Sequence, residues 1–284
     1  MRFEKWQALG NDYLIVEASD LSFPLTPAAV RTLCDRHTGP GADGVLELSR
    51  SEAPGFVARL RIFNPDGSEA ELSGNGAREA ILYLRRAGWT DQDRFSIETA
   101  AGEIRPTILG PATCRVDMGR ARLRSDDFPA GGPDGTGEVA GRRFQYVHVG
   151  NPQCAIRVAD VDELGGLDLA AIGPAIEHDP RFPNRTNVSF WCPLAPDAIR
   201  ARIFERGVGE TRSSGTGACG AAVAFALQGG DSPITVQLDG GELVVDVDES
   251  LHLDLTGWAV PVYRGTLSDE LLDELRSSGP RAPR

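Results

Sequence analysis

Two serines occupy matching positions in two copies of one short motif. Ser73 begins Ser-Gly-Asn-Gly-Ala and Ser214 begins Ser-Gly-Thr-Gly-Ala, and each motif leads into an expected helix, residues 77–86 and 218–228. The glycines let a ligand approach the backbone closely. A helix start offers unpaired N–H groups and a positive dipole end, which suit a carboxylate or a phosphate. A single serine at this place could be a plain helix cap, but the duplication favours a ligand site.

The repeat extends well beyond the two serines. Residues 59–77 align with residues 200–218 without a gap, and each copy reads as a short alternating strand, a polar loop and a helix start. A second pair, Gly10-Asn11 and Gly150-Asn151, precedes a strand in each half. The 284-residue chain is therefore expected to contain a duplicated domain. Its predicted halves are residues 1–120, completed by the segment 258–270, and residues 121–257.

The order of the remaining elements is that of a strand-rich chain. Pro27 to Asp35 is expected to form a helix capped by Thr26, and the polar Pro- and Gly-rich stretch 120–140 reads as a linker between the halves. We find no regular βαβ alternation, so a parallel doubly wound sheet is not predicted.

Composition excludes several classes of protein. The net charge of −12 argues against a nucleic-acid partner. Lys5 is the only lysine, which argues against a pyridoxal-phosphate enzyme. The five cysteines and four histidines show no metal-ligand spacing, so no metal is expected. No apolar run is long enough for a membrane span, and the first residues lack the apolar core of a signal peptide, so we expect a cytoplasmic protein without a membrane partner.

The chain as a whole resembles the diaminopimelate epimerase family from Phe3 to about Tyr263. The motifs that carry the resemblance are Leu-Gly-Asn-Asp-Tyr at 9–13, Asp-Arg-His at 35–37, Phe-Asn-Pro-Asp-Gly-Ser-Glu-Ala at 63–70, Gly-Asn-Gly-Ala-Arg at 74–78, Gly-Asn-Pro at 150–152, Glu-Arg-Gly-Val-Gly-Glu-Thr at 205–211 and Gly-Thr-Gly-Ala-Cys at 215–219. The resemblance implies an α+β fold of two pseudo-symmetric domains, each a mixed β-sheet wrapped around a central helix, with one active site between them.

The same resemblance implies an activity. It is the inversion of an amino-acid α-carbon by two bases and without a cofactor, from LL- to meso-diaminopimelate, in the pathway to lysine and peptidoglycan precursors. The implied partners are a small amino-acid substrate and a second copy of the chain in a homodimer. The residues implied to bind substrate are Asn11, Asn64, Gly74, Asn75, Asn151, Asn187, Glu205, Arg206, Gly215 and Thr216. Backbone N–H groups at the two helix starts would hold the α-carboxylate and stabilise the enediolate that forms when the α-proton leaves.

The sequence departs from the family at the two implied catalytic positions. The family has a cysteine before each Gly-x-Gly, whereas this chain has Ser73 and Ser214, and Gln153 stands where the family commonly has histidine. A serine hydroxyl takes up an α-proton only if a neighbouring base relays it. That base would be a carboxylate, and the candidates are Glu69, Glu205 and Glu210.

Three interpretations follow from this departure. The chain is an epimerase of the diaminopimelate type with serines at the acid and base positions. Alternatively, it is an isomerase or racemase of the same fold that acts on another small acid through a carboxylate such as Asp66 or Glu210. The third interpretation is a catalytically silent protein that binds an amino acid, or a form inactivated by replacing cysteine with serine.

Overall fold

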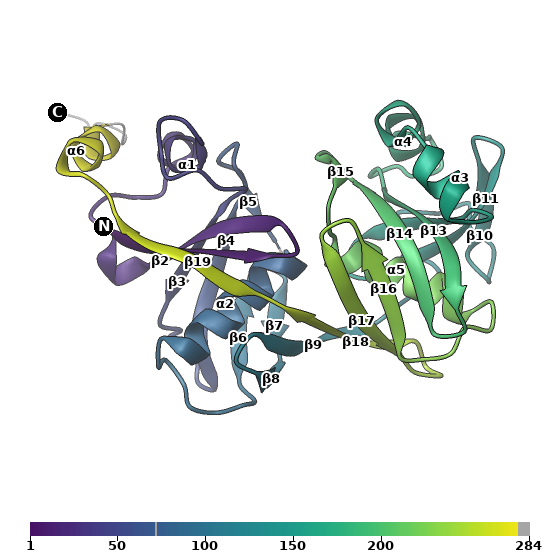
Figure 1. Cartoon of the computed structure of the whole chain (residues 1–284), viewed down its shortest axis with the longest axis horizontal. Helices are drawn as coiled ribbons and strands as arrows, with labels where there is room; N and C mark the ends of the chain where they lie inside the picture. The colour runs from purple at the N-terminus through teal and green to yellow at the C-terminus, as the bar shows by residue number, and fades with distance from the viewer. Residues whose placement is uncertain (72, 278–284) are drawn as a thin grey trace. The chain divides into compact units, whose positions relative to one another are not determined.

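The chain divides into two compact units in the computed structural model, which describes residues 1–71 and 73–277. Unit 1 comprises Met1–Cys114 and, among the described residues, 258–277; unit 2 comprises Arg115–Gly257 (Figure 1). Within the described part of the chain, no helix has the length and apolar character needed to cross a bilayer.

Unit 1 is built on one mixed sheet. Its strands lie in the order β19 (Val260–Thr266), β1 (Arg2–Ala8), β2 (Asn11–Glu17), β3 (Val45–Ser49), β4 (Phe56–Phe63), β6 (Ser96–Thr99) and β7 (Gly102–Ile104), and β5 (Glu69–Ala70) pairs with β4. The other elements of this unit are the 3-10 turn η1 (Ala18–Asp20), α1 (Pro27–Cys34), α2 (Gly74–Arg86), β8 (Pro106–Gly110) and α6 (Asp269–Ser277).

Unit 2 has the same kind of sheet. Its strands lie in the order β10 (Thr136–Val139), β11 (Arg142–His148), β12 (Pro152–Arg157), β13 (Asn187–Ala195), β14 (Ala198–Glu205), β16 (Ile234–Leu238), β17 (Gly241–Val247), β18 (His252–Trp258) and β9 (Thr113–Arg120), and β15 (Gly209–Thr211) pairs with β14. Its helices are α3 (Val161–Gly166), α4 (Leu169–Glu177) and α5 (Gly215–Ala226).

Parallel strand pairs recur at matching places in the two sheets. In unit 1 β2 pairs parallel with β3 and β4 with β6, and in unit 2 β12 pairs parallel with β13 and β14 with β16. Each of these connections contains a helix, so βαβ units are present although none was predicted. They were missed because their helices lie among antiparallel hairpins, which hide the alternation along the chain.

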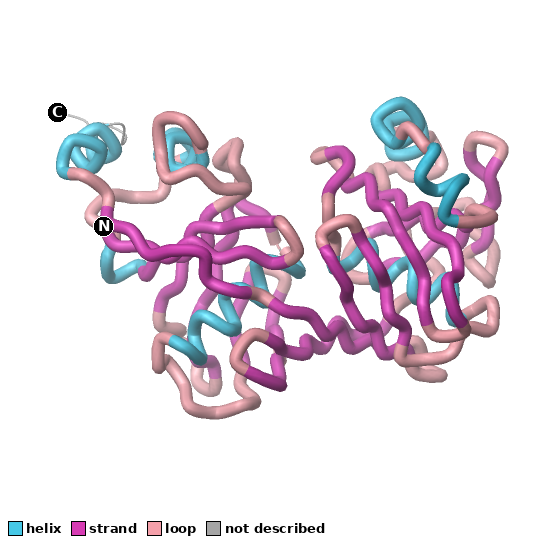
Figure 2. Tube along the Cα trace, viewed as in Figure 1, coloured by secondary structure: helices cyan, strands magenta, loops and turns pink. Residues whose placement is uncertain are grey.

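One helix in each unit is packed inside its sheet. Helix α2 contacts β1, β2 and β3, and α5 contacts six strands of unit 2, β11 to β14 with β16 and β17. Figure 2 shows strands on several sides of each helix. The runs of small residues in α5, from Ala218 to Ala224, let the surrounding strands approach closely. Both helices begin three residues earlier than predicted, at Gly74 and Gly215, because the serines before them act as caps.

The stretch predicted as a linker contributes to the core of unit 2. Phe128 is buried and lies within 5.5 Å, centroid to centroid, of the rings of Phe144, Tyr146 and Phe182. Four aromatic side chains packed together bury enough apolar surface to fix a segment that has few regular backbone hydrogen bonds. The prediction of a linker between the halves at 120–140 was therefore wrong, because the stretch lies within unit 2.

Candidate active site

Each of the two serines caps a central helix. Ser73 Oγ accepts the backbone N–H of Gly76 across 3.1 Å, and Ser214 Oγ accepts the backbone N–H of Gly217 across 3.2 Å. A hydroxyl in this role keeps its own proton and a second lone pair for another partner. Space around the second cap is tight, since a Cβ at Gly217 would lie 2.8 Å from Ile203 and 3.1 Å from Ser214 Oγ. Capping explains the serines locally and leaves them chemically available.

In unit 1 the predicted binding residues Asn11 and Asn75 contact each other. Asn75 Nδ2 donates to Asn11 Oδ1 across 3.2 Å, so the loop before β2 is tied to the first turn of α2. Asn11 Nδ2 donates to Asp43 Oδ2 across 2.9 Å. Both ends of the Asn11 amide therefore have fixed partners, which sets the orientation of Asn75 beside Ser73 and Gly74.

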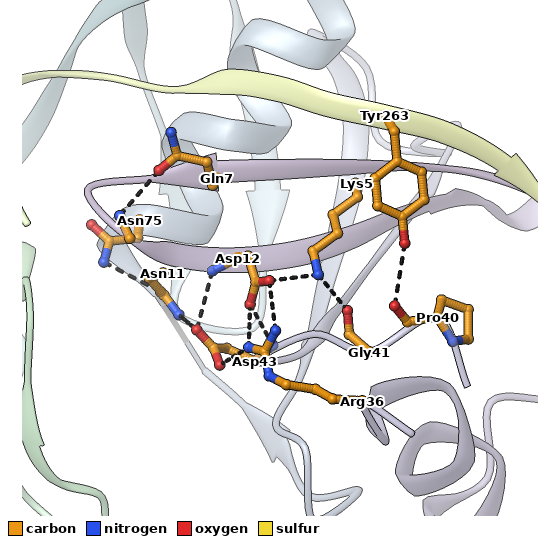
Figure 3. A network of polar contacts seen from close by, with 11 residues as sticks. Lys5, Gln7, Asn11, Asp12, Arg36, Pro40, Gly41, Asp43, Asn75 and Tyr263 are labelled. Carbon is orange, nitrogen blue, oxygen red and sulfur yellow. Dashed lines mark hydrogen bonds and ion pairs between the residues drawn. The ribbon is translucent and has the colours of Figure 1, made fainter. Parts of the chain in front are cut away.

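A charged network lies behind Asn11 (Figure 3). Asp12 forms ion pairs with Lys5 and with Arg36, at 2.7 Å each, and Arg36 also reaches Asp43 at 2.7 Å. Burial alone would raise the pKa of Asp12, but the hydrogen bonds and charges of Arg36 and Lys5 bring it down to about 2. The sole lysine of the chain is thus part of the scaffold that holds Asn11 in place.

Asn64 lies in the tight turn between β4 and β5. Its backbone N–H donates to the carbonyl of Ser68 across 2.8 Å, and its Nδ2 donates to Ser68 Oγ across 3.0 Å. The turn leads along the chain to Ser73. Asn64 is half-buried, and none of its hydrogen bonds in the described part of unit 1 reaches Asn11, Ser73 or Asn75.

Unit 2 repeats the link between loop and helix. Asn151 Nδ2 donates to Thr216 Oγ1 across 3.2 Å, as Asn75 and Asn11 are joined in unit 1. Asn151 Oδ1 accepts from Gln153 Nε2 across 2.6 Å. Gln153 is fully buried, and Gly220 of α5 leaves room for it, because a Cβ at Gly220 would lie 2.8 Å from the Gln153 Cβ.

Asn187 joins two other segments of the predicted site. Its Nδ2 donates to the carbonyl of Pro152 across 3.0 Å, and its Oδ1 accepts the backbone N–H of Arg206 across 2.9 Å. The Arg206 side chain donates to the carbonyl of Asn184 across 3.0 Å. The predicted residues of the second half, from Asn151 through Asn187 to Arg206, are therefore brought together in one cluster.

Glu205 is the titratable group beside Ser214. Burial raises its pKa above the ordinary value, and hydrogen bonds from the hydroxyls of Thr211 and Ser214 act in the opposite direction. The Thr211 Oγ1 donates to Glu205 Oε1 across 2.7 Å. A carboxyl with a raised pKa next to a hydroxyl is a candidate proton acceptor.

The other carboxylates considered from the sequence have different partners. Glu69 forms an ion pair with Arg61 at 2.8 Å, and Glu210 forms one with Arg202 at 2.7 Å. In each pair the glutamate and the arginine lie on neighbouring strands. Hydrogen bonds from Ser68 lower the pKa of Asp66, which is exposed. Glu205 is therefore the best placed of the four carboxylates to assist a serine.

One group of possible metal ligands was not visible in the sequence. Asp117, His252 and Asp254 place one ligand atom each within 4.8 Å of one another, and His252 pairs with Asp117 at 3.0 Å. All three are only half-buried, on the neighbouring strands β9 and β18. Asp117 is far from the other two along the chain, and the pairing of β9 with β18 brings the three side chains together. We assign no metal role to them.

Comparison with known proteins identifies the family. The family model described as diaminopimelate epimerase matches residues 3–124 and 145–262. Diaminopimelate epimerase of Desulforudis audaxviator is 42% identical over 285 residues, covering 96% of this chain and 98% of that protein. Diaminopimelate epimerase 2 of Nostoc sp. is 39% identical over 282 residues, covering 95% and 97%.

A solved structure shares the fold. The probable proline racemase of Agrobacterium radiobacter K84 superposes with a TM-score of 0.67 at 16% identity, covering 94% of this chain and 93% of that one. The predicted α+β fold, with a mixed sheet around a central helix in each half, is confirmed. From the match over both halves and the identity to its relatives, the chain belongs to the diaminopimelate epimerase family and is an isomerase.

Proposed function

We propose that this chain is a cofactor-independent epimerase that interconverts LL- and meso-diaminopimelate. The duplicated helix start carries the proposal. In each unit a capping serine lies two residues before a residue that is hydrogen-bonded to an asparagine of a neighbouring loop, Asn75 to Asn11 and Thr216 to Asn151. Identity of 42% to a relative named diaminopimelate epimerase, over nearly the whole length of both chains, supports the substrate.

The residues of the two helix starts would bind the reacting end of the substrate. Backbone N–H groups at Gly74, Asn75, Gly215 and Thr216 would hold the α-carboxylate, because the start of a helix favours a negative charge. The same donors would stabilise the enediolate after the α-proton leaves. Asn64, Asn187 and Arg206 would bind the distal amino-acid end, and Asn11 and Asn151 would orient the helix starts.

The proton would leave the substrate through Ser214 and Glu205. As Ser214 Oγ takes the α-proton, its own hydroxyl proton passes to the Glu205 carboxylate, so Glu205 becomes neutral and the substrate becomes the enediolate. The pKa of Glu205, raised by burial, brings the carboxyl closer to the range in which it can both accept and release a proton near neutral pH. Ser73 would deliver a proton to the other face of the carbon.

Proton exchange tests the proposal directly. The chain is incubated with LL- and with meso-diaminopimelate in D2O, and the α-hydrogen is followed by NMR beside a Ser73→Cys/Ser214→Cys variant. We expect exchange with inversion in the parent and faster inversion in the variant, because a thiol ionises near neutral pH far more readily than a hydroxyl. Silence of both proteins would refute diaminopimelate as the substrate.

A second candidate function is an isomerase or racemase that acts on another small acid. One observation favours it: the titratable group beside Ser214 is a carboxyl, whereas the family pattern relies on thiols. This function would be supported if the chain exchanges the α-hydrogens of other amino or hydroxy acids but not those of diaminopimelate. The exchange should be lost in the Glu205→Gln variant.

Family membership also supports three further proposals. The halves 1–120 with 258–270 and 121–257 would be the two copies of one ancestral domain, the enzyme would work as a homodimer, and it would work in the cytoplasm. Sedimentation equilibrium of the purified chain tests the second of these, since a single species at the 30.4 kDa monomer mass would refute it.

A further inference from the structure

The two serines differ in the hydrogen bonds that their oxygens accept. Ser73 Oγ accepts two of them, from the Gly76 N–H at 3.1 Å and from the Tyr13 hydroxyl at 3.1 Å. A serine hydroxyl has two lone pairs and one proton. Both lone pairs of Ser73 are thus engaged by donors, and the hydroxyl proton is what this side chain can offer to a substrate.

Ser214 is arranged in the opposite sense. Its Oγ accepts from the Gly217 N–H at 3.2 Å, and its hydroxyl acts on the neighbouring Glu205 carboxyl, whose pKa it lowers against the effect of burial. This arrangement leaves one lone pair of the oxygen for an incoming proton. Ser73 and Ser214 are therefore equivalent in the sequence repeat, but they differ in the partners of their hydroxyl groups.

We propose that Tyr13 is the positioning and proton-supplying residue behind Ser73, which makes Ser73 the acid of the reaction. This inference rests on the proposed epimerase function. When the Ser73 hydroxyl gives its proton to the α-carbon, the Tyr13 hydroxyl gives its proton to Ser73 Oγ, so serine is restored and tyrosine becomes a phenolate. In the reverse direction the phenolate recovers its proton through Ser73 as the α-proton is removed.

The fold fixes the position of the Tyr13 hydroxyl. Tyr13 lies on β2, opposite Trp6 of β1 in the sheet, and only 6% of it is exposed. Its ring packs over Gly44, where an added Cβ would lie 2.5 Å from the Tyr13 Cε1. Because the ring is packed in this way, its hydroxyl stays at one place, and little conformational entropy is lost when the Tyr13 proton is transferred to Ser73.

The first test is the variant Tyr13→Phe, which removes the hydroxyl and keeps the ring. Exchange and inversion of LL- and meso-diaminopimelate are followed separately by NMR in D2O. We expect inversion to fall by about 10²-fold or more. Exchange without inversion should persist for the isomer whose α-hydrogen faces Ser214, because removal and return of the proton through Glu205 do not need Tyr13.

A matched control is Tyr146→Phe in unit 2. Tyr146 also shares a hydrogen bond with a serine, Ser125, at 2.5 Å, and it is part of the aromatic core and not of the predicted site. This variant should invert both isomers at the parental rate. Unchanged inversion by Tyr13→Phe, with equal exchange of both isomers, would overturn the proposal.

The second test needs no substrate. In a Ser73→Cys variant the introduced thiol is the reactive one, since all five native cysteines are buried. Its pKa is read from the pH dependence of alkylation by iodoacetamide, with and without Tyr13→Phe. Loss of the phenol donor should raise this pKa by about one unit or more, because a hydrogen bond to the thiolate is lost.

The two tests distinguish a failure of the proposed substrate, diaminopimelate, from a failure of the role proposed for Tyr13. If the parent is silent toward diaminopimelate while Tyr13→Phe raises the pKa of the introduced thiol, the substrate is wrong and the Tyr13–Ser73 donor pair stands. If the parent epimerises diaminopimelate while Tyr13→Phe changes neither the thiol pKa nor the inversion rate, the epimerase stands and the role of Tyr13 is refuted.

Discussion

Gln153 donates its side-chain Nε2 to Oδ1 of Asn151 across 2.6 Å from a fully buried position on β12. Because Asn151 in turn donates to Thr216, Gln153 decides which end of the Asn151 amide points toward α5. The Oε1 of Gln153 itself has no hydrogen-bond partner among the described residues. Burying an amide oxygen without a hydrogen bond is unfavourable for folding. The unpaired oxygen of Gln153 therefore lowers stability, while its Nε2 orients Asn151 in the candidate site.

Replacing Gln153 with leucine should therefore separate stability from binding. The free energy of unfolding should stay within about 1 kcal/mol of the parent, because the variant removes one unpaired buried atom together with one hydrogen bond. KM for the substrate should rise by roughly fivefold, since Asn151 loses the partner that orients it. Urea unfolding and steady-state kinetics measure the two effects, and an unchanged KM would show that Asn151 is oriented without Gln153.

Glu205 should control the acid limb of the pH profile. A base must be ionised to act, so kcat/KM should rise with pH through the pKa of Glu205, which burial places above the ordinary 4.5. Glu205→Gln keeps the size of the side chain and should lower kcat by about 10²-fold or more and abolish this limb. Glu210→Gln is the matched control, because Glu210 pairs with Arg202 on β14. An acid limb that persists in Glu205→Gln would assign the base elsewhere.

Glu79 should make stability fall as the pH rises. It lies fully buried on α2, burial raises its pKa well above 4.5, and the charge of Arg78 offsets only part of this effect. The folded state keeps a proton that the unfolded state releases, so the contribution is present below the ordinary pKa and is lost as the pH rises through the raised one.

A Glu79→Gln variant tests this dependence. It should flatten the decline of unfolding free energy with pH and stabilise the protein near neutral pH, because it remains uncharged in both states. Guanidinium unfolding at a series of pH values measures it. Destabilisation at neutral pH would instead mean that Glu79 is ionised and held by Arg78.

Asp12 should have the opposite effect on stability, which it should lower as the pH falls. Its pKa of about 2 lies below the ordinary 3.8, so its contribution to stability is present above 3.8 and is lost as the pH falls through about 2. The difference corresponds to about 2 kcal/mol, and Asp12→Asn should lower the free energy of unfolding at neutral pH by at least this amount, because it leaves Lys5 and Arg36 without their shared partner. Asp20→Asn, at the exposed pair with Arg2, should cost clearly less, because solvent screens that pair. Equal costs for the two variants would contradict this role for Asp12.

Local sequence was enough to predict that each serine motif leads into a helix, although both helices begin three residues earlier than predicted, at Gly74 and Gly215. A cap depends on a hydrogen bond between a serine and the residue three positions later, as in Ser73 with Gly76 and Ser214 with Gly217, so all of its parts lie in one short segment. The same holds for Thr26, which caps α1 as predicted. Motifs spread along the chain were likewise sufficient for the family and for the duplicated α+β fold, because repeated segments preserve their order and spacing.

Tertiary structure decided which partners the capped serines receive. Tyr13 and Glu205 reach Ser73 and Ser214 through sheet pairing and helix packing, which no local pattern encodes, and so the repeat alone made the two serines look alike. The burial of Phe128 and Glu79 was also invisible, since a side chain in a polar stretch or beside an arginine becomes buried only when distant segments close over it. Hydrogen bonds between neighbours in sequence are determined locally, whereas the environment of a titratable group is set by residues far along the chain.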